Sequence, residues 1–187
     1  MKLNLGACDR PFPGFSSIDI VEPADRIVDL EGPWPWPMNS VDEVLAHDVI
    51  EHIGDCDHIS ETYRCYRCGC GAQDARYDGR EMRHPLGRIH FMNELYRVLK
   101  PGCFATIETP NASRGAGFFQ DPTHKTPWCM NSFQYFTLDA FANTRFNKSY
   151  GITAAFKVVS LSERPYQDVC EEVWKITAVL QKPVTPY

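Results

Sequence analysis

The sequence predicts an open, Rossmann-like α/β sheet that is mostly parallel and ends in an antiparallel strand. Three observations lead to this fold class. Short apolar runs alternate with turn residues through the N-terminal part of the chain. An amphipathic helix then precedes a further strand, and two strand-like segments separated by a polar stretch close the chain. With 187 residues, the chain is expected to form a single domain over residues 1–187.

Four strands are predicted in the first 50 residues, at residues 2–5, 17–20, 26–30 and 41–47. The first is apolar and ends at Gly6, which is typical of a buried strand that enters a tight turn. Pro11 and Pro13 follow at once, so the first crossover must be a loop or a single turn. In the fourth strand residues 44–46 are all apolar, as in a strand covered on both faces.

A loop rich in proline precedes the fourth strand and contains Trp34 and Trp36. Proline favours an extended chain that lies on the core. We therefore interpret the two rings as surface-packed aromatics of a rigid loop and leave them out of the functional site.

Residues 54–88 break the alternation, because they are rich in Cys, Arg, Gly and Tyr and poor in aliphatic side chains. We interpret them as a cysteine-rich insertion within the domain. A helical period returns at Ile89, with Met92, Leu95 and Leu99 on one stripe and a stop signal at Pro101.

The last third of the chain begins with a fifth strand at residues 104–108. Residues 109–137 form a long polar and aromatic stretch, which is typical of a functional loop or a lid. Thr137 is expected to cap a short helix. The final two strands are predicted at residues 156–161 and 173–180.

Composition argues against several classes of protein. The formal charge is −5, from 24 acidic and 19 basic side chains, so general nucleic-acid binding is not expected. No apolar run approaches the roughly 18 to 20 residues that span a bilayer, and Asp9 and Arg10 interrupt the N-terminus before a signal-peptide core forms. We therefore expect a soluble, cytoplasmic protein that neither spans nor binds a membrane.

The first candidate site is the run Leu3-Asn4-Leu5-Gly6-Ala7-Cys8-Asp9 together with Asp19. A glycine after the first strand lets backbone amides approach a cofactor, and an acidic residue at the end of the second strand accepts hydrogen bonds from ribose hydroxyls. The spacing alone fits equally well a tight turn followed by a surface aspartate.

Further motifs follow in order and carry a family resemblance. They are Gly14-Phe15-Ser16-Ser17-Ile18-Asp19-Ile20, Val28-Asp29-Leu30, Trp36-Pro37-Met38-Asn39-Ser40-Val41-Asp42, His47-Asp48-Val49-Ile50-Glu51-His52-Ile53, Phe91-Met92-Asn93-Glu94-Leu95-Tyr96-Arg97-Val98-Leu99-Lys100-Pro101-Gly102, Gln120-Asp121-Pro122-Thr123-His124 and Asn131-Ser132-Phe133. Together with the first run, they resemble the small class I S-adenosylmethionine-dependent methyltransferases, in particular a type 11-like group with a Leu-Asn-Leu-Gly start. The resemblance covers nearly all of the chain except residues 54–88.

The resemblance implies the class I methyltransferase fold, S-adenosylmethionine as cofactor and an acceptor that is a small molecule, a sugar or a protein. It implies that Gly6 and Ala7 face the methionine part of the cofactor, that Asp19 holds the ribose, and that Asp29 and Leu30 border the adenine. The full set of cofactor residues implied in this way is Leu5, Gly6, Ala7, Asp19, Ile20, Asp29, Leu30 and His47. The family usually has a second glycine where this chain has Cys8.

A general base is needed only if the methyl acceptor is an unactivated hydroxyl or a protonated amine. His124 is the first candidate because an imidazole titrates near neutrality, and Asp121, Asp48 and His47 follow it. The alternative for His124 is that its ring only braces a turn.

The insertion carries a second candidate site, for a metal ion. Two thiolates of a Cys-x-x-Cys pair can bind one tetrahedral zinc ion, and a third Cys or a His completes such a structural site. The predicted ligands are Cys56, Cys65, Cys68 and Cys70, with His58 or His84 as alternates. Free thiols in a loop are the alternative interpretation.

Two further functions compete with methyl transfer. The first is a non-catalytic module that binds a cofactor or a partner through a zinc-stapled insertion, which Cys8 in the glycine position favours. The second is a dinucleotide oxidoreductase, but its glycine-rich turn should open a helix, and Pro11 and Pro13 prevent one here.

Overall fold

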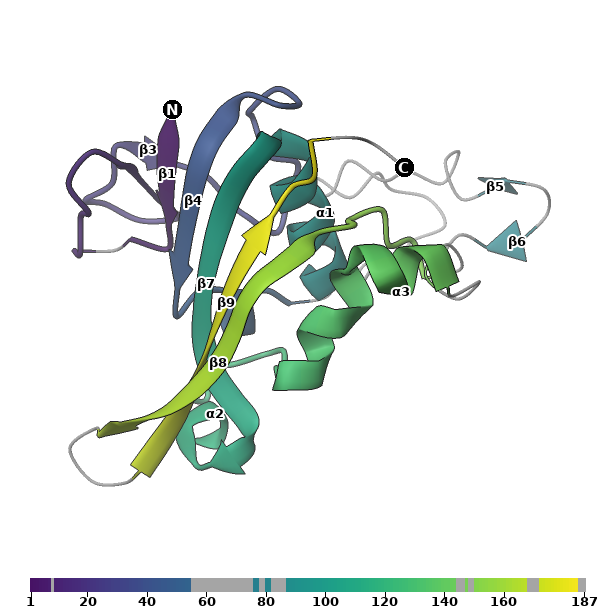
Figure 1. Ribbon diagram of the computed structural model, residues 1–187. Helices are drawn as coiled ribbons and strands as arrows, with labels where there is room; N and C mark the ends of the chain where they lie inside the picture. The colour runs from purple at the N-terminus through teal and green to yellow at the C-terminus, as the bar shows by residue number, and fades with distance from the viewer. Residues whose placement is uncertain are drawn as a thin grey trace.

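A mixed sheet forms the centre of the computed structural model, which describes residues 1–7, 9–54, 76–77, 80–81, 87–143, 147, 150–167 and 172–184 (Figure 1). Within these residues the sheet has seven strands in the order β3-β2-β1-β4-β7-β9-β8. The strands are β1 (Lys2–Leu5), β2 (Ser16–Asp19), β3 (Arg26–Ile27), β4 (Val41–His47), β7 (Leu99–Gly115), β8 (Lys157–Gln167) and β9 (Glu172–Gln181). A separate short pair consists of β5 (Arg76–Tyr77) and β6 (Arg80–Glu81).

The five strands from β3 to β7 in this order pair in parallel, whereas β9 is antiparallel to both β7 and β8. The predicted fold class, a mostly parallel sheet with an antiparallel C-terminal strand, is thereby confirmed. Because β1 lies between β2 and β4, the strand order reverses beside β1. Ligands of open α/β sheets bind at such a switch point, beyond the carboxyl ends of the strands.

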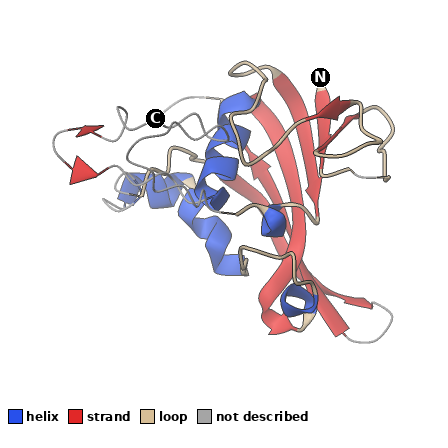
Figure 2. Ribbon diagram, turned by 180° about the vertical axis from the view of Figure 1, so that it is seen from behind, coloured by secondary structure: helices blue, strands red, loops and turns tan. Residues whose placement is uncertain are grey.

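One face of the sheet is a continuous apolar surface. Leu3 pairs with Val44, Val44 with Ala105, and Ala105 with Leu180, and these four side chains are buried. The helix α1 (Gly87–Val98) covers the core with Phe91, Met92, Leu95 and Val98, and Figures 1 and 2 show α1 and α3 (Leu138–Asn143) on the same side of the sheet. The predicted helix and its stripe are confirmed, although the helix begins two residues earlier and ends at Val98.

The stretch from residue 109 to residue 137 is more ordered than a loop. The strand β7 continues to Gly115, and the elements α2 (Gly117–Gln120) and η2 (Met130–Phe136) follow. Trp128 is fully buried and packs on Phe133, with ring centroids 5.0 Å apart. Burial of these aromatic rings anchors the segment to the core. Thr137 caps α3 as predicted, because its hydroxyl accepts a hydrogen bond from the amide of Ala140 at 3.2 Å.

The proline-rich loop packs into the core and not at the surface. Trp34 and Trp36 are buried and stack edge to face with centroids 5.8 Å apart. Glu94 of α1 accepts the amide of Trp34 at 2.9 Å, and Arg97 donates to the carbonyls of Trp34 and Trp36 at 3.0 and 2.8 Å. The expectation of surface-packed rings is therefore wrong, because an ion pair on α1 satisfies the loop's backbone and lets both rings turn inward.

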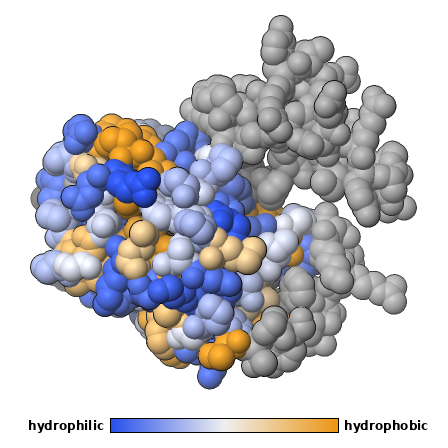
Figure 3. All heavy atoms as spheres, turned by 90° about the horizontal axis from the view of Figure 1, so that it is seen from above, coloured by the Kyte–Doolittle hydropathy of each residue, from blue (hydrophilic) through white to orange (hydrophobic). Residues whose placement is uncertain are grey.

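The end of the molecule at which the parallel strands begin carries mostly polar side chains between smaller apolar groups (Figure 3). Asp42 forms ion pairs there with the N-terminal amino group and with Lys100, the latter at 2.6 Å. Within the described part of the chain, none of the helices is both long enough and apolar enough to cross a membrane.

The turn after β1 depends on the missing side chain of Gly6. This residue has a φ of +63°, and a Cβ placed on it would lie 2.6 Å from two carbons of Val49. Both the backbone conformation and the close approach therefore require glycine.

We expect Gly6→Ala to lower the free energy of unfolding by about 3 kcal/mol, because the energetic cost of a left-handed conformation adds to that of a steric clash with Val49. Gly14→Ala is the matched control, since Gly14 also has a positive φ but a Cβ placed on it would meet no atom within 4 Å. For Gly14→Ala we expect a loss of about 1 kcal/mol. Urea unfolding of both variants measures the difference, and equal losses would contradict the steric argument.

Candidate functional site

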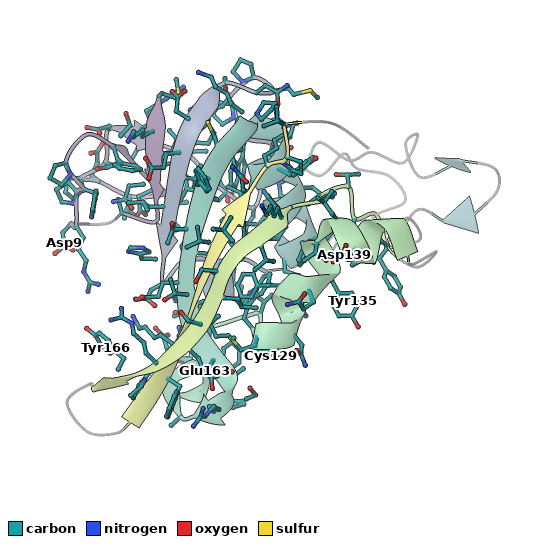
Figure 4. All side chains as sticks on the ribbon, in the orientation of Figure 1. Asp9, Cys129, Tyr135, Asp139, Glu163 and Tyr166 are labelled. Carbon is teal, nitrogen blue, oxygen red and sulfur yellow. The ribbon has the colours of Figure 1, made fainter. Side chains whose placement is uncertain are left out.

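The candidate site lies where the parallel strands end. Gly6 follows β1, Asp19 ends β2, Asp29 follows β3, and His47 and Asp48 stand at the end of β4. Figure 4 shows Asp9, beyond β1, and Tyr166 of β8 toward the same end of the molecule. Parallel pairing thus gathers at one edge of the sheet residues as far apart in the chain as Gly6 and Asp48.

The turn after β1 is tied to β2 through its backbone. The amides of Gly6 and Ala7 both donate to the carbonyl of Ile18, at 2.8 and 3.2 Å. The side-chain amide of Asn4 donates to the carbonyl of Arg10 at 3.0 Å and holds the following loop back over the strand. β2 therefore already engages both amides, and contact of the Gly6-Ala7 turn with a cofactor stays a prediction.

Two carboxylates follow β2 and β3 and are oriented by their own backbone. Oδ1 of Asp19 accepts the amide of Ile20 at 2.7 Å, and Oδ1 of Asp29 accepts the amide of Glu31 at 2.9 Å. The amide of Val28 donates to the carbonyl of Asp19 at 2.7 Å and joins the two turns. Each aspartate is thus held in a fixed position at the edge, as a carboxylate that binds hydroxyl groups would need to be.

Asp48 occupies an unusual backbone conformation, with a φ of +52°. Such strain in a non-glycine residue is typical of functional sites. Its Oδ2 accepts a hydrogen bond from Lys175 of β9 at 2.6 Å, and Lys175 also lies 3.5 Å from Glu108. Burial opposes the charge of Lys175, but the bond to Asp48 and the charges of Asp48 and Glu108 outweigh it and raise the pKa of Lys175.

Glu51 lies three residues beyond Asp48, in the short helix η1 (Ile50–His52), and is completely buried. Its Oε2 accepts a hydrogen bond from the hydroxyl of Thr109 at 2.8 Å. Burial raises the pKa of Glu51 to about 7. Hydrogen bonds that the carboxylate accepts from its own backbone amide and from Thr109 act in the opposite direction and lower this pKa. A buried carboxyl with a raised pKa is characteristic of functional sites.

His124 and Asp121 come from the segment between α2 and η2 and meet Glu51. Nε2 of His124 lies 3.9 Å from Oε1 of Glu51 and 3.9 Å from Oδ2 of Asp121. Nδ1 of His124 lies 2.7 Å from the carbonyl of Phe118, which can only accept, so Nδ1 carries the proton of the neutral ring. Hydrogen bonds from Thr123 lower the pKa of Asp121.

His52 completes this cluster. Its ring centroid is 4.7 Å from that of His124, and Nδ1 lies 3.1 Å from the hydroxyl of Thr123. Burial and the neighbouring charge of His124 lower the pKa of His52. The amides of Lys125 and Thr126 donate to the carbonyl of Glu51 at 2.8 and 3.0 Å and fasten the His124 segment onto η1.

The predicted residues therefore fall into two groups. The turns at Gly6, Asp19 and Asp29 with His47 and Asp48 line the ends of the strands, whereas His124 and Asp121 gather around Glu51. Sequence reasoning did not include Glu51, His52 or Lys175 among the candidate site residues. The available signal was the run Asp48-x-x-Glu51-His52, which places three ionisable side chains directly after the fourth strand.

Part of the predicted site lies outside the described residues. This applies to Cys8 and to all of the predicted zinc ligands and their alternates, Cys56, Cys65, Cys68, Cys70, His58 and His84. Zinc binding by the insertion stays a prediction.

Comparison with known proteins identifies the fold. No protein-family model matches the chain, and no curated protein does. Among solved structures, an S-adenosylmethionine-dependent methyltransferase from Methanosarcina mazei is similar, with 11% identity, a TM-score of 0.57 and coverage of 98% of this chain and 92% of that one. The N-methyltransferase NodS from Bradyrhizobium japonicum, in complex with S-adenosylhomocysteine, has 10% identity, a TM-score of 0.50 and coverage of 97% and 77%.

The [4+2]-cyclase SpnF is similar to the same degree, with 13% identity, a TM-score of 0.54 and coverage of 98% of this chain and 75% of that one. The similarity to these structures extends over nearly the whole chain, and the sheet order agrees with the predicted fold. This chain therefore has the class I methyltransferase fold.

Proposed function

We propose that this protein is a methyltransferase that uses S-adenosylmethionine. The observation that carries the proposal is the edge of a class I methyltransferase sheet at which the Gly6 turn, Asp19 and Asp29 meet. The donor set suits the cofactor, because a fixed carboxylate can accept hydrogen bonds from the two ribose hydroxyls. Asp19 would hold the ribose, and Asp29 and Leu30 would border the adenine.

The Gly6 turn would face the methionine part of the cofactor through its carbonyl groups, since the amides of Gly6 and Ala7 already bind Ile18. Leu5 and Ile20, which flank the two turns, would border the same ligand. His47 and Asp48 at the end of β4 would lie beside the reactive end.

When bound, the cofactor supplies an electrophilic methyl group on a sulfonium, so the protein contributes mainly the position of the acceptor. Among the predicted bases, His47 is exposed, whereas the side chain of His124 is only 7% exposed and its Nε2 faces two carboxylates. We therefore assign proton transfer, where the acceptor needs it, to His47 or Asp48. The acceptor is a small molecule, a sugar or a protein.

A non-catalytic module that binds a cofactor or a partner is the second candidate, because a fold does not fix a function: SpnF, a cyclase, is similar to this chain as well. The two candidates differ in turnover. A methyltransferase accumulates S-adenosylhomocysteine when a suitable acceptor is present, and a binding module holds the cofactor unchanged.

We expect the purified chain to bind both S-adenosylmethionine and S-adenosylhomocysteine, since the proposed contacts do not involve the transferred methyl. Isothermal titration calorimetry in the presence of a chelator measures both affinities. Absence of binding to both ligands at millimolar concentration would overturn the proposal.

Asp19→Asn should weaken binding of S-adenosylhomocysteine roughly tenfold or more, because the charge that strengthens the ribose hydrogen bonds is lost. Asn keeps an oxygen for the amide of Ile20, so the turn should persist. Asp139→Asn is the matched control, since Asp139 is exposed on α3, away from this edge (Figure 4). Similar affinities in both variants would remove Asp19 from the site.

A further inference from the structure

The proposed cofactor contacts do not use the side-chain cluster of Glu51 and His52 in η1 with His124. One ligand atom each from Glu51, His52 and His124 lies within 4.8 Å of the others. We propose that these three residues bind a divalent first-row transition-metal ion. The inference stands apart from the proposed methyl transfer, because it involves none of the residues assigned to the cofactor.

Glu51 provides the anionic ligand. Its side chain is fully buried, and among the described residues its Oε1 has no hydrogen-bond partner. Thr109 holds the other oxygen at 2.8 Å and thereby aims Oε1 at His124. A buried carboxylate oxygen without a partner is costly, and a bound cation would compensate its charge.

His124 is oriented as metal-binding histidines usually are. Such residues donate the N–H of one ring nitrogen to a carbonyl or carboxylate and present the other to the ion. Here Nδ1 of His124 donates to the carbonyl of Phe118 at 2.7 Å, and the ring of Phe118 stacks on the imidazole with centroids 5.3 Å apart. Nε2, the basic nitrogen, then faces Glu51.

The distance between these two ligand atoms suits an ion better than a hydrogen bond. Nε2 of His124 and Oε1 of Glu51 are 3.9 Å apart, which exceeds hydrogen-bond length. Two metal–ligand bonds of about 2.1 Å each can span this separation. The two side chains are thus placed to bind one ion between Nε2 of His124 and Oε1 of Glu51.

His52 is held by a similar outer contact. The hydroxyl of Thr123 donates to Oδ1 of Asp121 at 2.6 Å, so it accepts from Nδ1 of His52 at 3.1 Å. The proton of the neutral His52 ring is therefore on Nδ1, and Nε2 keeps its lone pair. All three residues accordingly have one basic atom to offer.

The ligand types indicate the class of ion. Two imidazoles and one carboxylate favour Mn²⁺, Fe²⁺, Co²⁺ or Zn²⁺ over Mg²⁺ and Ca²⁺, which prefer oxygen ligands. Three protein ligands also leave coordination positions for exogenous groups.

The test is a titration of the full chain with Mn²⁺, without nucleoside, followed by electron paramagnetic resonance of the free ion and by calorimetry. Mn²⁺ is suitable because thiolates, which are soft ligands, compete poorly for it. We expect one Mn²⁺ per chain at this cluster. Glu51→Gln, His52→Asn and His124→Asn should each weaken binding at least tenfold.

Two control variants define specificity. His90→Asn removes a histidine that bonds the carbonyl of Gly32 on another part of the fold, and Cys65→Ser with Cys68→Ser removes the central thiols of the insertion. Both should keep the affinity of the unmodified chain for Mn²⁺. Circular dichroism checks folding, and His52→Asn, at a half-buried position, gives a readout if the buried Glu51→Gln fails to fold.

The proposal is overturned if the unmodified chain shows no saturable binding at millimolar Mn²⁺, or if only the cysteine variant loses the ion. Equal weakening by His90→Asn would also overturn it. Because calorimetry with S-adenosylhomocysteine is run in a chelator, failure of metal binding and failure of cofactor binding are separate results.

Discussion

The close contact between Gly6 and Val49 is the constraint on which both halves of the site depend. Gly6 follows β1, and Val49 lies two residues beyond the end of β4, so their contact fixes the turns of two adjacent parallel strands against each other. The Gly6 turn in turn holds β2 through the carbonyl of Ile18. The Gly6 turn thereby positions Asp19, which follows Ile18 in β2. Val49 directly follows Asp48 and lies two residues before Glu51.

The second half of the site is assembled from segments about 70 residues apart. The carbonyl of Glu51 accepts the amides of Lys125 and Thr126, and the hydroxyl of Thr126 donates to the carbonyl of Ile50 at 3.0 Å. Lys125 then pairs with Glu31 at 2.7 Å, beyond the end of β3. These backbone contacts, and not side-chain chemistry alone, bring His124 to Glu51.

Local patterns were enough to predict the elements whose neighbours in sequence determine them, such as the strands at residues 2–5 and 41–47. The burial of Trp34 instead depends on Glu94, 60 residues later in the chain, so no local pattern could predict it. The same difference explains which site residues the sequence disclosed. Asp19 belongs to a short motif that ends a strand, whereas Glu51 is important because Thr109 and His124 surround it in space. Its burial, which no motif encodes, distinguishes it from an ordinary acidic residue in the first turn of a helix.

Charge compensation at the edge of the sheet singles out Glu51. Asp48 binds Lys175, Lys175 approaches Glu108, and Glu108 binds Arg164 at 2.8 Å, so charges alternate across β4, β9, β7 and β8. Each of these carboxylates has a lysine or an arginine within 3.5 Å. Oε1 of Glu51 instead faces Nε2 of His124 at 3.9 Å, and when that ring is neutral Nε2 brings a lone pair and not a charge. An acidic oxygen and a basic nitrogen that face each other in the interior repel unless a proton or a metal ion lies between them, and the lone pair of His52 favours the metal ion.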